Sequence, residues 1–220
     1  GLMPNISKLF LKSGTEFNSF TARSLTLPSW GTIFTGHTPD QHGIRSNTPI
    51  SRNSKRTKGD YTDVCKDLLS VYKTGKNRSL VHLQESGVKW IADYYDPESV
   101  IMNYMPYSDG LNLPFKDFAK FSFKNLDSFI YGSQSGVLAL DIASVDRAIR
   151  LIKKNPGKHK LIMNWFASVD VHSHHNNESL NDVYYSLDKS IGSLVKALRK
   201  DPVLKDAHVF MVSDHGMRGG

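Results

Sequence analysis

The sequence predicts an α/β fold in which helices cover a central, largely parallel sheet. Two segments with helical periodicity, 141–154 and 180–199, alternate with two apolar runs, 160–168 and 207–213, that are typical of buried strands. Helices that alternate with strands in this way predict a parallel sheet covered by helices. A chain of 220 residues is long enough to bury the core of one such domain. We therefore expect a three-layer sandwich formed by residues 1–220.

The N-terminal residues predict a helix, a short strand and a second helix. The first helix spans residues 4–13, with Pro4 in its first turn and an apolar face. A strand is expected over 15–21. The second helix spans 28–35, with Pro28 in its first turn and a glycine just past its end.

The middle of the chain predicts an irregular insertion over residues 45–135. Turn-forming and polar residues over 37–60 indicate a loop, and a helix is expected over 62–72. Short apolar runs follow, such as the one at 100–102, and turn signals separate them.

The last third predicts a helix, a strand, a second helix and a second strand. Each helix has an apolar stripe with a period near 3.6 residues. The positions that share a face are Ile142, Val145, Ile149 and Ile152 in the first helix, and Val183, Leu187, Ile191, Leu194, Val195 and Leu198 in the second.

Composition excludes several classes of protein. A single Cys rules out an internal disulfide framework and a zinc site built from several cysteines. No apolar stretch is long enough for a membrane span, and no signal peptide is expected at the start. The net charge of +7 suits an anionic partner such as a phosphate ester, or serves solubility alone. The densest basic stretch, 45–58, has no aromatic residue for base stacking, so nucleic-acid-specific binding is not expected.

Potential metal ligands follow the apolar run at 160–168. Asp170 and His174 are four residues apart, so one helical turn would point both side chains the same way. Carboxylate oxygen and imidazole nitrogen both bind zinc well. The spacing leaves open whether His172 or His175 takes the place of His174. A solvated polar loop is the alternative.

A second pair follows the run at 207–213. Asp214 and His215 are adjacent, and a sharp turn at Gly216 would let both face one ion. Ligands gather at the carboxyl ends of strands in open α/β sheets, so the two pairs could converge on one site.

Thr26 precedes the helix predicted at 28–35. The positive end of a helix is a favourable place for a phosphate anion, and a hydroxyl there could attack phosphorus if a metal lowered its pKa. The alternative is that Thr26 only caps the helix.

Three motifs together resemble the alkaline phosphatase superfamily, and most closely its type I phosphodiesterase/nucleotide pyrophosphatase branch. They are TLPSWGTIFTGHTPDQHGI from Thr26, DVHSH from Asp170 and the closing SDHGM. The resemblance implies a hydrolase of phosphate esters, chiefly diesters, with two divalent metal ions, expected to be zinc. It places the nucleophile that forms a covalent phosphothreonine at Thr26. It also places Asp214 and His215 on one metal, and Asp170 and His174 on the other.

The chain departs from the family's pattern at several points. Phosphodiesterases tend to carry an Asn that would hold a phosphate oxygen at the position of Ser29, and Ser29 can still donate one hydrogen bond there. Trp30 would line a leaving-group pocket. Two further expected ligands, an upstream Asp and a downstream His, fall outside the chain, so we expect a piece that is truncated at both ends.

Rival functions are a phosphomonoesterase, a phosphotransferase or a non-catalytic phosphate binder. Sulfatase chemistry is not expected, because Thr26 cannot become formylglycine. The resemblance favours a periplasmic or secreted location.

Overall fold

The computed structural model describes residues 1–12, 14–16, 20–21, 24–46, 87–103, 134–174 and 180–216. The chain divides into two compact units. Unit 1 comprises Gly1–Asn18, Asp96–Met105 and Leu113–Val209, and unit 2 comprises Ser19–Tyr95, Pro106–Asn112 and Phe210–Gly220. The helix predicted at 62–72 lies outside the described residues.

Unit 1 contains a parallel two-stranded sheet. Strand β1, Val100–Asn103, pairs with β2, Leu161–Asn164, in a register that places Val100 opposite Leu161 and Asn103 opposite Asn164. All four residues of β1 are buried, as expected for a strand covered by helices. The predicted α/β class is therefore confirmed. Since β1 lies within 45–135, at least this part of the predicted insertion belongs to the sheet.

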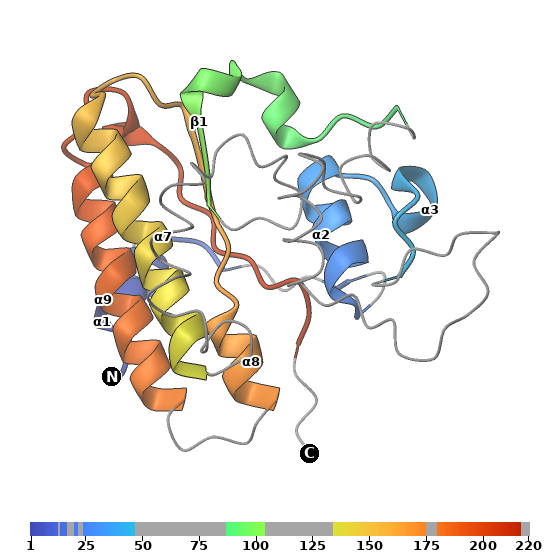
Figure 1. The fold of residues 1–220 in the computed structure, drawn as a ribbon, viewed down its shortest axis with the longest axis horizontal. Helices are drawn as coiled ribbons and strands as arrows, with labels where there is room; N and C mark the ends of the chain where they lie inside the picture. The colour runs from blue at the N-terminus through green and yellow to red at the C-terminus, as the bar shows by residue number, and fades with distance from the viewer. Residues whose placement is uncertain are drawn as a thin grey trace. The chain divides into compact units, whose positions relative to one another are not determined.

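Two long helices pack side by side in unit 1 (Figure 1). They are α7, Gln134–Lys154, and α9, Leu180–Leu198, and both were expected from their periodicity. Between them in sequence lies the short helix α8, Ser168–His174, so the strand predicted over 160–168 ends earlier than expected. Apolar side chains from the helices and β1 form one core, because burying them removes apolar surface from water. The buried members are Ile101, Ala148, Ile152, Leu198 and Leu204.

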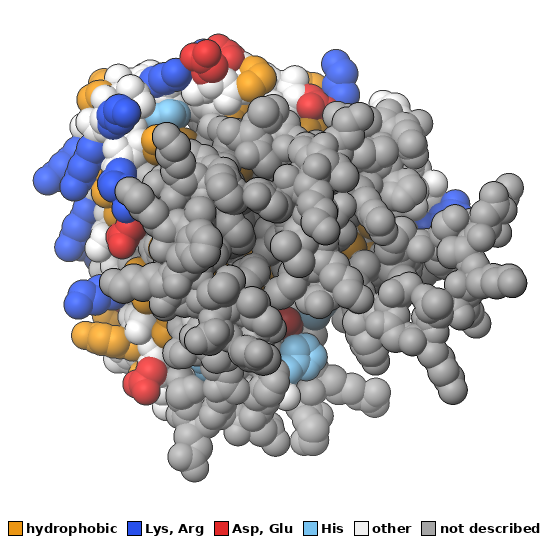
Figure 2. All heavy atoms as spheres, viewed as in Figure 1, with side chains coloured by type: hydrophobic (Ala, Val, Ile, Leu, Met, Phe, Trp, Pro, Cys, Tyr) orange, Lys and Arg blue, Asp and Glu red, His pale blue; other side chains and the backbone are white. Residues whose placement is uncertain are grey.

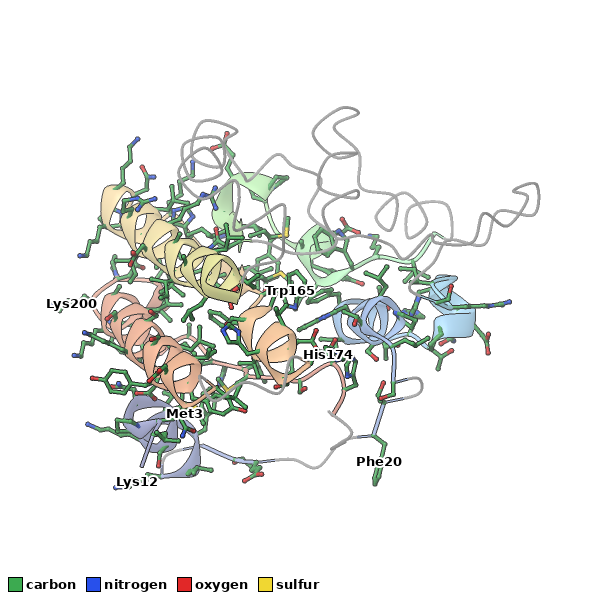
Figure 3. All side chains as sticks on the ribbon, turned by 60° about the horizontal axis from the view of Figure 1, so that its bottom comes forward. Met3, Lys12, Phe20, Trp165, His174 and Lys200 are labelled. Atoms are coloured by element: carbon green, nitrogen blue, oxygen red, sulfur yellow. The ribbon has the colours of Figure 1, made fainter. Side chains whose placement is uncertain are left out.

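The N-terminal helix is held against α9 by one buried carboxylate. Helix α1, Pro4–Ile6, continues into the π-helical turn η1, Ser7–Leu11, which confirms the predicted helix. Asp188 of α9 accepts hydrogen bonds from the backbone N–H groups of Asn5 and Ile6 and from the Asn5 side chain, at 2.8–3.2 Å. These bonds satisfy N–H groups that the first turn of a helix cannot pair internally. Figure 3 shows Met3 beside α9, where this contact is made.

Unit 2 contains α2, Thr26–Thr35, and the short α3, Pro39–His42. As predicted, α2 ends at a glycine, Gly36, whose φ of +70° lies in the left-handed region. His42 is fully buried and ties the two helices together: its Nδ1 accepts from the Ile44 N–H, so its Nε2–H donates to Thr32. Burial lowers the pKa of His42, which keeps the ring neutral. His42 is therefore a local hydrogen-bonding residue that joins α2 to α3.

Three short 3-10 helices complete the described elements. They are η2, Ile91–Tyr94, η3, Pro97–Ser99, and η4, Leu204–Asp206. No described helix is both long enough and apolar enough to cross a membrane.

Two predicted strands are wrong for the described residues. Residues 207–213 have no strand assignment, and Phe210 is 85% exposed. The described residues of 15–21 are likewise not a strand. The apolar pattern reports a preference for extended backbone, but a strand forms only where a neighbouring strand completes the hydrogen-bond ladder.

Candidate active site

Thr26 is the first residue of α2 and faces His215. The N-cap residue of α2 is Leu25, and its side chain makes no capping hydrogen bond. Thr26 is therefore not the N-cap residue that the alternative interpretation required. The Thr26 Oγ1 atom lies 3.4 Å from His215 Nε2. The predicted nucleophile and a predicted ligand, 189 residues apart in sequence, therefore lie together within unit 2.

The backbone carbonyl of Gly216 orients the His215 ring. The ring Nδ1 lies 3.1 Å from this oxygen. Because a carbonyl only accepts hydrogen bonds, Nδ1 must carry a proton, and the neutral ring then presents a lone pair at Nε2. Gly216 itself has an ordinary φ, and a side-chain carbon at this position would meet open space. The chain bends at Asp214 and His215, but this bend does not require the left-handed conformation that glycine favours.

Asp214 adds a carboxylate to the same point. Its Oδ2 lies 3.5 Å from His215 Nε2, and its Oδ1 accepts from the His215 backbone N–H at 3.1 Å. Both side chains are largely buried, with 19% and 15% exposed. A carboxylate oxygen, a ring-nitrogen lone pair and the Thr26 hydroxyl oxygen thus converge. The Thr26 hydroxyl can donate its proton to the Nε2 lone pair. A carboxylate oxygen and an imidazole nitrogen are both ligands that zinc binds, so the Asp214–His215 pair fits a divalent cation.

Asp170 and His174 form the second predicted pair, on α8 in unit 1. His174 Nε2 lies 3.4 Å from Asp170 Oδ1, as the spacing of one helical turn predicts. Both side chains are half exposed or more, and Figure 3 shows His174 at the end of α8. His172 is buried instead, with its Nδ1 donating to the Ser168 carbonyl at 2.7 Å. This geometry favours His174 over His172 as a ligand; His175 lies outside the described residues.

The buried Asp141 of α7 holds the start of α8, a role that sequence reasoning missed. Its carboxylate accepts hydrogen bonds from the backbone N–H groups of Ala167, at 3.2 Å, and Ser168, at 2.9 Å. Burial raises the pKa of Asp141 to about 6, against these hydrogen bonds, which lower it. No local pattern could have indicated the contact, because Asp141 and Ala167 are 26 residues apart.

The two predicted substrate-binding residues are buried in unit 2. The Ser29 hydroxyl lies 2.8 Å from Thr21 Oγ1. Trp30 stacks on Phe34 with ring centroids 5.2 Å apart, and Phe34 meets Trp90 edge to face. These contacts account for the burial of both residues. Their roles toward a phosphate oxygen and a leaving group stay predictions.

The candidate ligands form two pairs, one in each unit. Asp214 and His215 belong to unit 2, together with Thr26, and Asp170 and His174 belong to unit 1. Within the described ranges, no third His, Cys, Asp or Glu completes a group that could hold a metal ion. The convergence of both pairs on one two-metal centre stays a prediction.

Comparison with known proteins gives a match at the level of a protein family. A family model described as type I phosphodiesterase / nucleotide pyrophosphatase matches residues 1–220. Neither a curated protein nor a solved structure matches the chain.

Proposed function

The chain belongs to the type I phosphodiesterase/nucleotide pyrophosphatase family, and from this premise we propose that it hydrolyses phosphate diesters with Thr26 as the nucleophile. The family supports a hydrolase that acts on small phosphate-ester substrates. The observation that supports Thr26 as the nucleophile is the distance of 3.4 Å between Thr26 Oγ1 and His215 Nε2.

The position of Thr26 suits attack on an anionic ester. It begins a helix of ten residues, whose N-terminal end carries a partial positive charge. That end favours the phosphoryl oxygens of a substrate bound next to Thr26. The hydroxyl itself is a weak nucleophile at its ordinary pKa and needs activation.

Diester hydrolysis would take place in two steps. In the first, Thr26 Oγ1 bonds to phosphorus as the bond to the leaving-group oxygen breaks; the hydroxyl loses its proton, and the leaving group departs as an alcohol. In the second, water attacks the phosphothreonine, releases a phosphate monoester and returns a proton to Thr26. The net reaction is diester plus water to monoester plus alcohol.

Two carboxylate–imidazole pairs would hold the metal ions. Asp214 and His215 would hold one divalent cation and Asp170 and His174 a second, with zinc expected from the mixed oxygen and nitrogen donors. When bound, such cations supply positive charge that lowers the pKa of a nearby hydroxyl and neutralises phosphoryl oxygens. The Gly216 carbonyl contributes by holding the His215 ring with its lone pair toward Thr26.

We also propose that β1 and β2 are part of a larger sheet between two helical layers. The parallel pairing and the packing of α7 against β1 and β2 support this three-layer arrangement.

Assays with an aryl phosphodiester and an aryl phosphomonoester, with and without chelator, test the proposed function. We expect the diester to be the better substrate and chelation to abolish its turnover. Thr26→Ala should lower diester turnover by at least about 10³-fold, whereas Thr26→Ser should retain part of it because the hydroxyl remains.

Thr35→Ala is the matched control for Thr26→Ala. It removes a hydroxyl from the other end of α2, where Thr35 Oγ1 donates to the Gly31 carbonyl. Its diester turnover should stay within a few-fold of the wild-type value. Diester hydrolysis that survives both Thr26→Ala and exhaustive chelation would exclude this function, and a preference for the monoester would favour the rival phosphomonoesterase.

A further inference from the structure

The C-terminal ends of α7 and α9 form a strongly basic surface at one end of unit 1. Figure 2 shows Lys and Arg side chains gathered along the edge where Figure 1 draws α9 and the end of α7. We name this region the basic end. Its exposed basic residues are Arg150, Lys153, Lys154, Lys158, Lys160, Lys196, Arg199, Lys200 and Lys205.

Two segments far apart in sequence build the basic end. Asp201, which follows α9, accepts a hydrogen bond at 2.8 Å from the backbone N–H of Gly157, which lies in the loop after α7. A side-chain carbon at Gly157 would lie only 3.4 Å from Pro202 and 3.7 Å from Val203. The lysines that flank Gly157 therefore share one surface with those that flank Asp201.

Little negative charge offsets this surface. No Asp or Glu occurs over residues 147–169. Among the described residues, the exposed acidic side chains at this end are Asp96, Glu98 and Asp206, with Asp146 one helical turn before Arg150; Glu98 is paired with Lys158 at 2.9 Å. Asp201 is only 3% exposed and is used by backbone N–H groups. Within the part of the chain that the structure describes, nine exposed cations against four exposed carboxylates leave an excess of five positive charges on this end.

The basic end is separate from the metal-ligand pair on α8. Lys160 immediately precedes β2, whereas α8 follows the carboxyl end of that strand. The two features therefore lie at opposite ends of the sheet. Figure 3 shows the same separation between Lys200, just after α9, and His174 at the end of α8. The basic end is thus not accounted for by substrate binding at α8.

We propose that the basic end docks the protein onto an anionic phospholipid bilayer. Seven of its nine cations are lysines, which attract a diffuse anionic surface without the planar, bidentate geometry that arginine provides. An apolar tip lies among them: Val203 is 49% exposed and Pro202 is also exposed. Lysines around a small apolar tip suit a surface with charged headgroups above hydrocarbon.

A nucleic-acid partner fits the basic end less well. Neither of its two segments, 150–160 and 196–206, contains Phe, Tyr or Trp on which a base could stack. An apolar tip at the centre of the surface would also gain nothing from facing a phosphate backbone.

Vesicle co-sedimentation of the full chain tests the proposal. The probe is phosphatidylcholine vesicles, either pure or with about a third phosphatidylserine, at about 0.1 M and about 0.5 M salt. We expect binding to the anionic vesicles only, weakened at the higher salt. The triple variant Lys154→Gln, Lys200→Gln, Lys205→Gln should lower the partition constant for anionic vesicles about 100-fold, because each lysine contributes about fivefold.

A matched variant controls for net charge. Lys12→Gln, Lys89→Gln, Lys189→Gln removes three exposed lysines elsewhere and should bind vesicles within about threefold of wild type. Equal losses in both triple variants would show that overall charge, rather than the basic end, drives binding, and would overturn the proposal.

The apolar tip separates the two kinds of anionic partner. Val203→Ser should lower vesicle binding about tenfold, because the side chain no longer enters the apolar layer, and leave binding to duplex DNA unchanged. Tighter binding to duplex DNA than to anionic vesicles, or no binding to the vesicles, would contradict the proposal.

Discussion

The buried carboxylate of Asp141 makes the stability of unit 1 depend on pH in a direction opposite to that of most carboxylates. Asp141 is 3% exposed, and burial raises its pKa to about 6 from an ordinary value of 3.8. The folded state therefore binds a proton more tightly than the unfolded state does. Stability from this group is fully present below about pH 4 and is lost as the pH rises through about 6.

The size of the effect follows from the shift in pKa. A difference of about two units, at 1.36 kcal/mol for each unit, corresponds to about 3 kcal/mol. Asp141→Asn mimics the protonated carboxyl and keeps one acceptor for the N–H groups of Ala167 and Ser168. The free energy of unfolding of this variant minus that of wild type should therefore rise by about 3 kcal/mol between pH 4 and pH 7.

Urea unfolding of wild type and variant at several pH values measures this difference. Taking the difference removes the contributions of all other titrating groups, provided that they are unchanged. Asp141→Ala should show the same pH trend, offset downward by about 1–3 kcal/mol, because it leaves the N–H groups at the start of α8 unpaired. A difference between Asn variant and wild type that stays flat, or falls, from pH 4 to pH 7 would refute the reasoning.

Three further substitutions test the packing. Gly31→Ala would place a side-chain carbon 2.7 Å from His42 Cε1, so we expect a loss of about 1–3 kcal/mol, measured by thermal unfolding. Asp188→Ala removes three hydrogen bonds to Asn5 and Ile6; it should cost about 2 kcal/mol and speed proteolysis near the N-terminus. His159→Phe should stabilise by about 1–3 kcal/mol at pH 7, since the buried ring nitrogens have no hydrogen-bond partner within the described part of the chain. Because burial lowers the pKa of His159, the gain should grow as the pH falls below 6.5.

Each of these three predictions can be contradicted by a specific result. Gly216→Ala meets open space and should leave stability unchanged, so equal losses at Gly31 and Gly216 would show that the contact with His42 is not the cause. Unchanged proteolysis in Asp188→Ala would argue against the N-terminal tie. A stability gain in His159→Phe that does not vary with pH would mean that ring protonation contributes nothing.

Local patterns in the sequence were enough to place the long helices and the spacing of one ligand pair. The apolar stripes of α7 and α9 repeat every 3.6 residues, and such a stripe reports which face is buried whatever it packs against. Asp170 and His174 lie together for a similar reason, because one helical turn relates them. The three short motifs likewise placed the chain in its family, which the match over residues 1–220 confirms.

Contacts between distant segments could not be obtained in this way. Residues 207–213 have the apolar pattern of a strand but no strand assignment, since pairing depends on a neighbour that the pattern does not contain. The hold of Asp141 on α8 and the gathering of lysines at the basic end join segments separated by tens of residues. The approach of His215 to Thr26 was implied by the family resemblance, but no local pattern indicates it. Such contacts are set by how the packed elements fold back on one another, so only the tertiary structure decides them.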